Sequence, residues 1–135
     1  MTQDAAYSLG RVDGKARALV MISCGSGAYN FASAAYIGTE KSRGKWQFSP
    51  AKFDYGDTVR TADNRLQLLI NAEWDPASQT ISSHSKGRGL GDCGAAENYV
   101  WDGAIFRLVS AYGMERCCGS FNWLTLWQSE AMITK

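Results

Sequence analysis

Two Asp-Gly dipeptides, each lying between short apolar segments, constrain the fold of this chain more than any other feature. They are Asp13-Gly14 and Asp102-Gly103. Asp and Gly tolerate the positive φ angles that a two-residue hairpin turn requires, so each dipeptide predicts a β-hairpin. The strands expected to pair are residues 5–9 with 18–22, and residues 99–101 with 105–109. The local sequence therefore favours antiparallel β-structure near both ends of the chain.

The rest of the chain continues this pattern, because no segment has a helical period and further short apolar segments alternate with turn signals. Those segments are residues 31–37, 46–48, 66–74, 80–85 and 123–127. The sequences K-S-R-G-K at 41–45 and D-P-A-S-Q at 75–79 predict turns. About seven to nine short strands predict a single all-β domain, an antiparallel sandwich or barrel stapled by disulfides. We expect it to span residues 1–135.

The charge balance argues against one class of partner. Fourteen basic and thirteen acidic residues leave a net charge of +1, which lacks the positive field on which nucleic-acid binding depends. The longest apolar run, residues 16–22, is interrupted by Arg17, whereas a membrane-spanning helix needs about 20 apolar residues. We therefore expect no nucleic-acid partner and no membrane insertion.

Four cysteines, Cys24, Cys93, Cys117 and Cys118, bear on the compartment. They form no C-x2-C pair and the chain has one histidine, so we expect no metal site and no cofactor. An even number of separated cysteines fits a disulfide framework in an oxidising compartment, and free thiols in a cytosolic protein are the alternative. We expect a Cys93–Cys117 bridge, since these residues lie at the outer ends of a predicted antiparallel pair. A Cys24–Cys118 bridge is the expected second one.

The first six residues are short and polar and have no apolar core of a signal peptide. If the protein is exported, as the cysteines indicate, the chain begins after the cleavage site. We therefore predict a periplasmic location.

The segment C-G-S-G-A-Y-N at residues 24–30 is the first candidate site. Small residues around Ser26 suggest a nucleophile elbow, but the spacing is not G-x-S-x-G and no helical pattern follows. A catalytic serine or thiol here would have to recruit His84, the one histidine, so we expect no enzyme. The segment is either a structural turn with Tyr29 packed inside, or a projecting loop in which Ser26, Tyr29 and Asn30 contact a partner.

The glycine-rich sequence K-G-R-G-L-G-D-C-G at residues 86–94 is the second candidate. Its successive N–H groups beside Lys86 and Arg88 can form an anion-binding nest, although the spacing is that of neither the P-loop nor the dinucleotide fingerprint. Glycines at this density are also typical of positive φ angles and of close backbone packing. We expect Lys86 and Arg88 to add charged contacts to a partner, with a purely structural role as the alternative.

The third candidate is the aromatic content of five Trp, six Tyr and five Phe. Trp101 and Phe106 flank the second Asp-Gly turn, and Trp123 and Trp127 share one face if their strand is regular. Aromatic residues of β proteins form cores and cross-strand pairs, and on a sheet surface they also stack on sugars.

Three motifs together carry a resemblance to a known family: C-G-S-G-A-Y-N at 24–30, K-G-R-G-L-G-D-C-G at 86–94 and W-D-G-x-x-F-R-L at 101–108. Followed by M-E-R-C at 114–117, they resemble the bacterial domain-of-unknown-function family 1176 over residues 18–128. The resemblance implies an exported envelope protein, and a chain that corresponds to the C-terminal half of longer members or to a short stand-alone version. Where the family pattern has C-R-G, this chain has Cys117-Cys118-Gly119, an extra cysteine that gives Cys24 a partner. The family has no established activity, so the resemblance implies no catalytic residue.

The sequence S-G-A-Y at residues 26–29 is also similar to the S-G-x-Y loop of periplasmic lysozyme inhibitors, small disulfide-stapled β proteins that insert a loop into the enzyme's cleft. We therefore expect a non-enzymatic periplasmic binding protein, an immunity protein or lysozyme-type inhibitor, whose partner is a peptidoglycan-acting enzyme or toxin. The alternative is an envelope module that binds a glycan or small ligand through surface aromatics.

Overall fold

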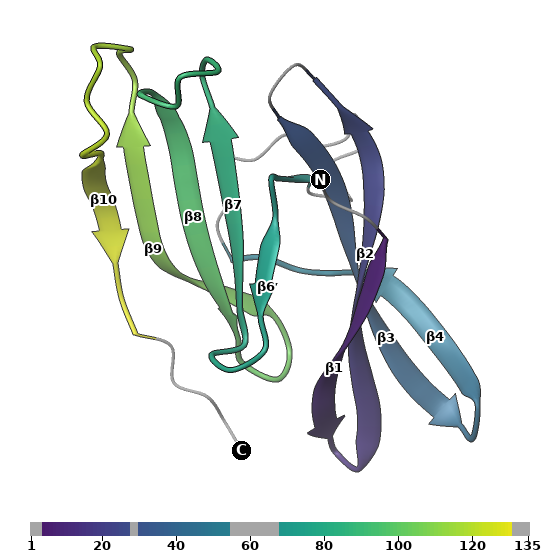
Figure 1. The fold of residues 1–135 in the computed structure, drawn as a ribbon. Helices are drawn as coiled ribbons and strands as arrows, with labels where there is room; N and C mark the ends of the chain where they lie inside the picture. Colours follow the sequence, from purple (N-terminus) through teal and green to yellow (C-terminus); the bar gives the residue numbers. More distant parts are fainter. Residues whose placement is uncertain (1–3, 28–29, 55–67, 131–135) are drawn as a thin grey trace.

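The computed structural model describes residues 4–27, 30–54 and 68–130, except for the side chain of Ser26. These residues form two antiparallel sheets and contain no helix, so the predicted all-β fold is confirmed (Figure 1). They include ten strands, slightly more than expected from the sequence. Within the same residues no helix is long and apolar enough to cross a membrane.

The first sheet has the strand order β1-β2-β3-β4, with β5 paired to the other part of the β3 edge. Its strands are β1 (Ala5–Val12), β2 (Lys15–Ser26), β3 (Phe31–Ser42), β4 (Lys45–Pro50) and β5 (Leu68–Ile70). The second sheet has the order β10-β9-β8-β7-β6. Its strands are β6 (Glu73–Asp75), β7 (Thr80–Lys86), β8 (Gly94–Trp101), β9 (Phe106–Met114) and β10 (Leu124–Gln128).

Both predicted Asp-Gly hairpins form, but their turns differ. Asp13 and Gly14 both have positive φ angles, 53° and 75°, and join β1 to β2 as a two-residue turn. At the second turn only Gly103 has a positive φ, 101°. The Asp102 carboxylate accepts hydrogen bonds from the N–H groups of Ala104 and Ile105, both at 2.8 Å. These bonds stabilise a longer connection, so β9 begins at Phe106.

The segment predicted as one strand over residues 66–74 is divided in the structure, and its first two residues lie outside the described part. Its remainder forms β5 and β6, which belong to different sheets. Asn71, between them, has a φ of 46°, a left-handed conformation that Asn tolerates better than most residues. The chain therefore crosses from the first sheet to the second at Asn71.

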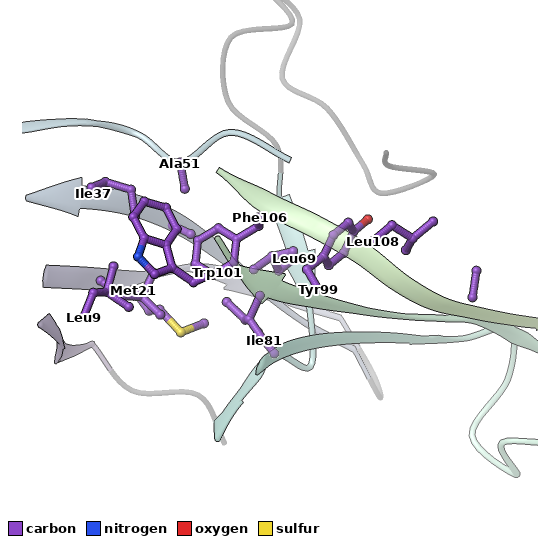
Figure 2. Close-up of a cluster of buried hydrophobic side chains, with 14 residues drawn as sticks. Leu9, Met21, Ile37, Ala51, Leu69, Ile81, Tyr99, Trp101, Phe106 and Leu108 are labelled. Atoms are coloured by element: carbon purple, nitrogen blue, oxygen red, sulfur yellow. The ribbon is translucent and has the colours of Figure 1, made fainter. Parts of the chain in front are cut away.

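The hydrophobic core lies between the two sheets, where alternate residues of the central strands face inward (Figure 2). Leu19 from β2, Ile81 from β7, Tyr99 from β8 and Phe106 from β9 are fully buried. Trp101 is also buried, so the core role is the correct one for the aromatics beside the second hairpin turn. Because successive residues of a strand point to opposite faces, the residues of β7, β8 and β9 that alternate with these buried ones lie on the outer face of the second sheet.

The predicted Cys93–Cys117 disulfide is present, with the two Cα atoms 4.8 Å apart. It joins the glycine-rich connection before β8 to the segment that follows β9. The expected Cys24–Cys118 bridge is wrong, since both residues are free and exposed. Cys24 lies on β2 of the first sheet beside a β-bulge, whereas Cys118 lies in the connection after β9 of the second sheet. One thiol thus lies on a strand of the first sheet and the other in a loop of the second sheet.

Candidate outer groove of the second sheet

The outer face of the second sheet carries a row of polar side chains that crosses four strands. Glu73 on β6 is paired with Ser82 on β7, Ser82 with Asn98 on β8, and Asn98 with Ser110 on β9. Directly paired residues of an antiparallel sheet project to the same face. The Asn98 side-chain amide donates a hydrogen bond to the Ser110 hydroxyl at 2.7 Å. We call these four residues the polar row.

A second row lies beside the polar row, two residues further along each strand and on the same face. His84 on β7 is paired with Ala96 on β8, and Ala96 with Tyr112 on β9. The ring of Trp123 packs on His84 in an edge-to-face arrangement, with the ring centroids 4.9 Å apart and the planes at 87°. Because Ala96 carries only a methyl group, the middle of this row is low and its two ends are raised by rings.

Two pockets lie along these rows, and together we call them the outer groove. The first, the polar pocket, has a volume of about 510 Å³. Its lining includes Glu73, Ser82, Asn98, Lys86, His84, Ala96, Glu97, Asn71 and Phe31. The second, the aromatic pocket, has a similar volume of about 510 Å³. It is lined by His84, Gly91, Ala96, Tyr112, Phe121, Asn122 and Trp123.

The electrostatics of the groove keep His84 uncharged near neutral pH. Desolvation by the surrounding atoms lowers the pKa of His84, and the positive charge of Lys86 lowers it further. The carboxylate of Glu73 acts in the opposite direction. A neutral imidazole has one donor and one acceptor nitrogen, so His84 can donate one hydrogen bond to a ligand and accept another from it.

An asparagine pair fixes the edge of the groove to the first sheet. Asn71 donates side-chain hydrogen bonds to the carbonyl of His84 at 2.8 Å and to the side-chain oxygen of Asn30 at 3.0 Å. Asn30 in turn accepts from the N–H of Lys86 at 3.0 Å and donates to the carbonyl of the same residue at 2.9 Å. The structure therefore brings together Asn30 and Lys86, two predicted site residues. The Asn30 amide is engaged in these bonds, and we assign it a bracing role.

The glycine-rich connection, by contrast, uses its charge internally. Arg88 forms a two-pronged ion pair with Asp92, in which its Nε donates to a carboxylate oxygen at 2.7 Å. Asp92 is buried and also accepts a hydrogen bond from the N–H of Gly119 at 2.6 Å. From the sequence we expect the Arg88 guanidinium to contact a carboxylate of a partner. In the structure it instead binds the Asp92 carboxylate of the same chain. Asp92 was not identified from the sequence as the partner of Arg88, because this pairing depends on the conformation of the loop.

Two glycines of this connection are required by the close packing around their backbone atoms. A Cβ at Gly87 would lie 2.7 Å from the Cys93 sulfur, and one at Gly94 would lie 1.9 Å from the carbonyl oxygen of Ser85. Gly94 also has a φ of 136°. Asp92, Cys93 and Cys117 bring three potential metal-ligand atoms within 4.8 Å of one another, but the two sulfurs are bonded to each other. The cluster is therefore a structural staple.

Because of the Arg88–Asp92 ion pair, the stability of the fold should depend on pH in the acid range. The hydrogen bond from Arg88 lowers the pKa of Asp92 from 3.8 to about 2, against the opposing effect of burial. A carboxyl whose pKa is lower in the folded protein stabilises the fold above its ordinary pKa, and this contribution is lost as the pH falls through the folded value. We expect the Tm to decrease as the pH falls from 3.8 to about 2.

Asp92→Asn tests this origin, with the exposed Glu115→Gln as a matched control. Thermal unfolding followed by circular dichroism should show a lower Tm for Asp92→Asn at pH 7, and the difference from the native protein should shrink towards pH 2. The control should follow the native curve. A constant difference across this pH range would assign the acid sensitivity to other carboxylates.

The loop at residues 24–30 is only partly described. β2 runs to Ser26, and the N–H of Gly27 donates to the carbonyl of Asn30 at 2.7 Å, which closes a tight connection to β3. The side chain of Ser26 and the whole of Tyr29 lie outside the described residues. Their role as contact residues stays a prediction.

Comparison with known proteins places this chain in a family. A family model described as "Protein of unknown function (DUF1176)" matches residues 4–130. The chain belongs to this family. It is similar to the "Uncharacterized protein YpfG" of Escherichia coli (strain K12), with 36% identity over 115 residues, which is 82% of this chain and 32% of the relative. The chain thus spans about a third of the length of this family relative. No solved structure matches.

Proposed function

We propose that this protein is a non-enzymatic binding module of the bacterial envelope that holds a glycan in the outer groove of its second sheet. The observation that carries the proposal is the pairing of the polar row with a neighbouring row that ends in aromatic rings. Sugar hydroxyls donate and accept at once, which matches the hydroxyl, amide and carboxylate groups of Ser82, Asn98 and Glu73. The apolar face of a sugar ring packs on an aromatic ring such as Trp123.

A binding role is also supported by the surroundings of His84. Its ring packs edge to face on Trp123 and lines both pockets of the outer groove, where a ligand can reach it. The Cys93–Cys117 bridge fits an oxidising compartment such as the periplasm, where we place the protein.

One observation favours a second candidate, the inhibition of a peptidoglycan-acting enzyme or toxin by insertion of the loop at residues 24–30. Two hydrogen bonds between Asn30 and Lys86 brace the end of this loop against the second sheet. A braced loop loses little conformational entropy when it docks into a cleft. Lys86 then lies at the base of the loop, in the position from which a charged contact to the enzyme is expected.

Glu73→Gln tests the glycan proposal, because Glu73 is exposed on an edge strand and its replacement leaves the core intact. A hydrogen bond to a charged group contributes about 1.5–3 kcal/mol, so we expect binding of a ligand held by Glu73 to weaken about tenfold or more. The probes are chitotriose and cellotriose, and the measurement is isothermal titration calorimetry. Glu40→Gln, the same change on β3 of the first sheet, should bind like the native protein.

The two candidates give different results with the same preparations. Glycan binding that Glu73→Gln weakens supports the first. Inhibition of lysozyme turnover without glycan binding would replace it with the second, and a native protein that binds neither trisaccharide contradicts the glycan proposal.

A further inference from the structure

The two pockets of the outer groove meet at a shared boundary. Both are lined by His84 and Ala96, the residues that face each other across β7 and β8 in the second row. Successive residues on one face of a strand are about 7 Å apart, so Ser82 and Asn98 lie one such step from His84 and Ala96. At the boundary Ala96 raises only a methyl group from the sheet. The polar pocket and the aromatic pocket therefore adjoin at His84 and Ala96.

The two pockets offer different chemistry to a ligand. The polar pocket presents hydroxyl, amide and charged groups from Ser82, Asn98 and Glu73. The aromatic pocket presents the rings of Tyr112, Phe121 and Trp123. Phe121 is 67% exposed, which leaves its ring open to a ligand. One end of the groove thus suits hydrogen bonding to sugar hydroxyls, and the other suits stacking on a sugar ring.

The charges near the boundary favour a ligand without net charge. One cation, Lys86, and one exposed anion, Glu73, both line the polar pocket, and they act on the His84 ring in opposite senses, Lys86 the more strongly. His84 lies between the two pockets and can donate and accept hydrogen bonds in its neutral form. This position suits the linkage between two sugar units, where an ether oxygen and neighbouring hydroxyls meet.

We infer that the outer groove consists of two adjacent subsites and selects a neutral oligosaccharide of at least two units over a monosaccharide. This inference rests on the proposed function and adds the size and charge class of the ligand. The polar subsite holds one unit by hydrogen bonds, and the aromatic subsite holds the next by stacking on Trp123. A monosaccharide occupies only one subsite and gains only one set of contacts.

The test is a calorimetric titration of the native protein with N-acetylglucosamine, chitobiose and chitotriose, and in parallel with glucose, cellobiose and cellotriose. We expect at least one series in which the disaccharide binds tenfold or more tightly than the monosaccharide. Trp123→Ala should remove this dependence on length, so that the disaccharide binds no more tightly than the monosaccharide, and Trp123→Phe should restore most of it. Trp127→Ala is the matched control, because Trp127 is exposed on β10 and does not line the groove.

Ala96→Leu supplies an independent test at the boundary, since a larger side chain there separates the two subsites. It should bring the affinity for the disaccharide down to that for the monosaccharide. Equal affinity of the native protein for mono- and disaccharides would overturn the two subsites and leave the proposed function standing. A disaccharide that still binds Trp123→Ala tenfold more tightly than the monosaccharide would also overturn them. If no sugar of either series binds, the proposed function fails, and the inference with it.

Discussion

Replacing Phe106 by Ala should lower the free energy of unfolding by about 3–5 kcal/mol, the usual range for a large aromatic side chain removed from a core. Phe106 is fully buried and lies at the centre of an aromatic cluster. Its ring stacks on Phe53 with centroids 5.0 Å apart and contacts Trp101 at 5.2 Å and Trp74 at 6.3 Å. Trp101 is the β8 partner of Phe106 in the second hairpin, Trp74 lies on β6, and Phe53 follows β4, so the cavity would loosen several elements together.

The backbone of Phe106 adds to this role. Its N–H donates to the carbonyl of Lys52 at 2.8 Å, and its carbonyl accepts from the N–H of Asp54 at 3.1 Å. Urea denaturation followed by tryptophan fluorescence measures the loss. Phe121→Ala is the control, because this ring is exposed and its removal should change stability by less than about 0.5 kcal/mol. Equal effects of the two substitutions would show that the core is not centred on Phe106.

Removal of the disulfide by a Cys93→Ser, Cys117→Ser double substitution should lower stability by about 2–5 kcal/mol. The bridge joins residues separated by 24 positions, for which the chain-entropy model gives about 3 kcal/mol. Cys93 is buried, so the substitution also leaves a hydroxyl group shielded from bulk water. Denaturant unfolding of the oxidised protein and the double variant measures the difference.

Alkylation of the native, unreduced protein checks the pairing itself. Peptide mapping should find Cys24 and Cys118 modified, since both are free and exposed, and Cys93 and Cys117 protected. The matched control is Cys24→Ser, Cys118→Ser, which removes two thiols and no bridge and should change stability little. Modification of Cys93 and Cys117 without reduction would contradict the bridge.

Much of the fold could be predicted from the sequence because its signals are local. The Asp-Gly turns, the alternation of apolar residues and the spacing of strands act within a few residues of one another. The Cys93–Cys117 pair followed from the same logic, as its members lie at the ends of neighbouring strands. The Cys24–Cys118 pair failed because it needed the relation between the two sheets. The prediction of one strand over residues 66–74 failed for a similar reason, since an apolar segment does not show that the chain changes sheets at Asn71.

The candidate site was harder to predict because it depends on register. Ser82, His84 and Lys86 alternate along β7, a pattern that marks one face of a strand and was visible in the sequence. Their alignment with Glu73 and Asn98 is set by strand pairing and cannot be read from any one segment. The second row also depends on a distant segment, because Trp123 reaches His84 across 39 sequence positions. A β-bulge between Thr125 and Trp127 interrupts the regular alternation on which a shared face for Trp123 and Trp127 depended.

The disulfide has a consequence for the rim of the outer groove. The aromatic pocket is walled by Gly91 on one side and by Phe121, Asn122 and Trp123 on the other. These two walls belong to the segments that Cys93–Cys117 joins covalently and that the Gly119–Asp92 hydrogen bond joins a second time. The two walls are therefore ordered once, when the chain folds and the disulfide forms, and would need no further ordering when a ligand of the proposed kind binds. Under the proposed function, we expect a chain kept reduced to retain its core between the sheets but to present a looser rim and bind its ligand more weakly, so that ligand binding depends on whether the disulfide has formed.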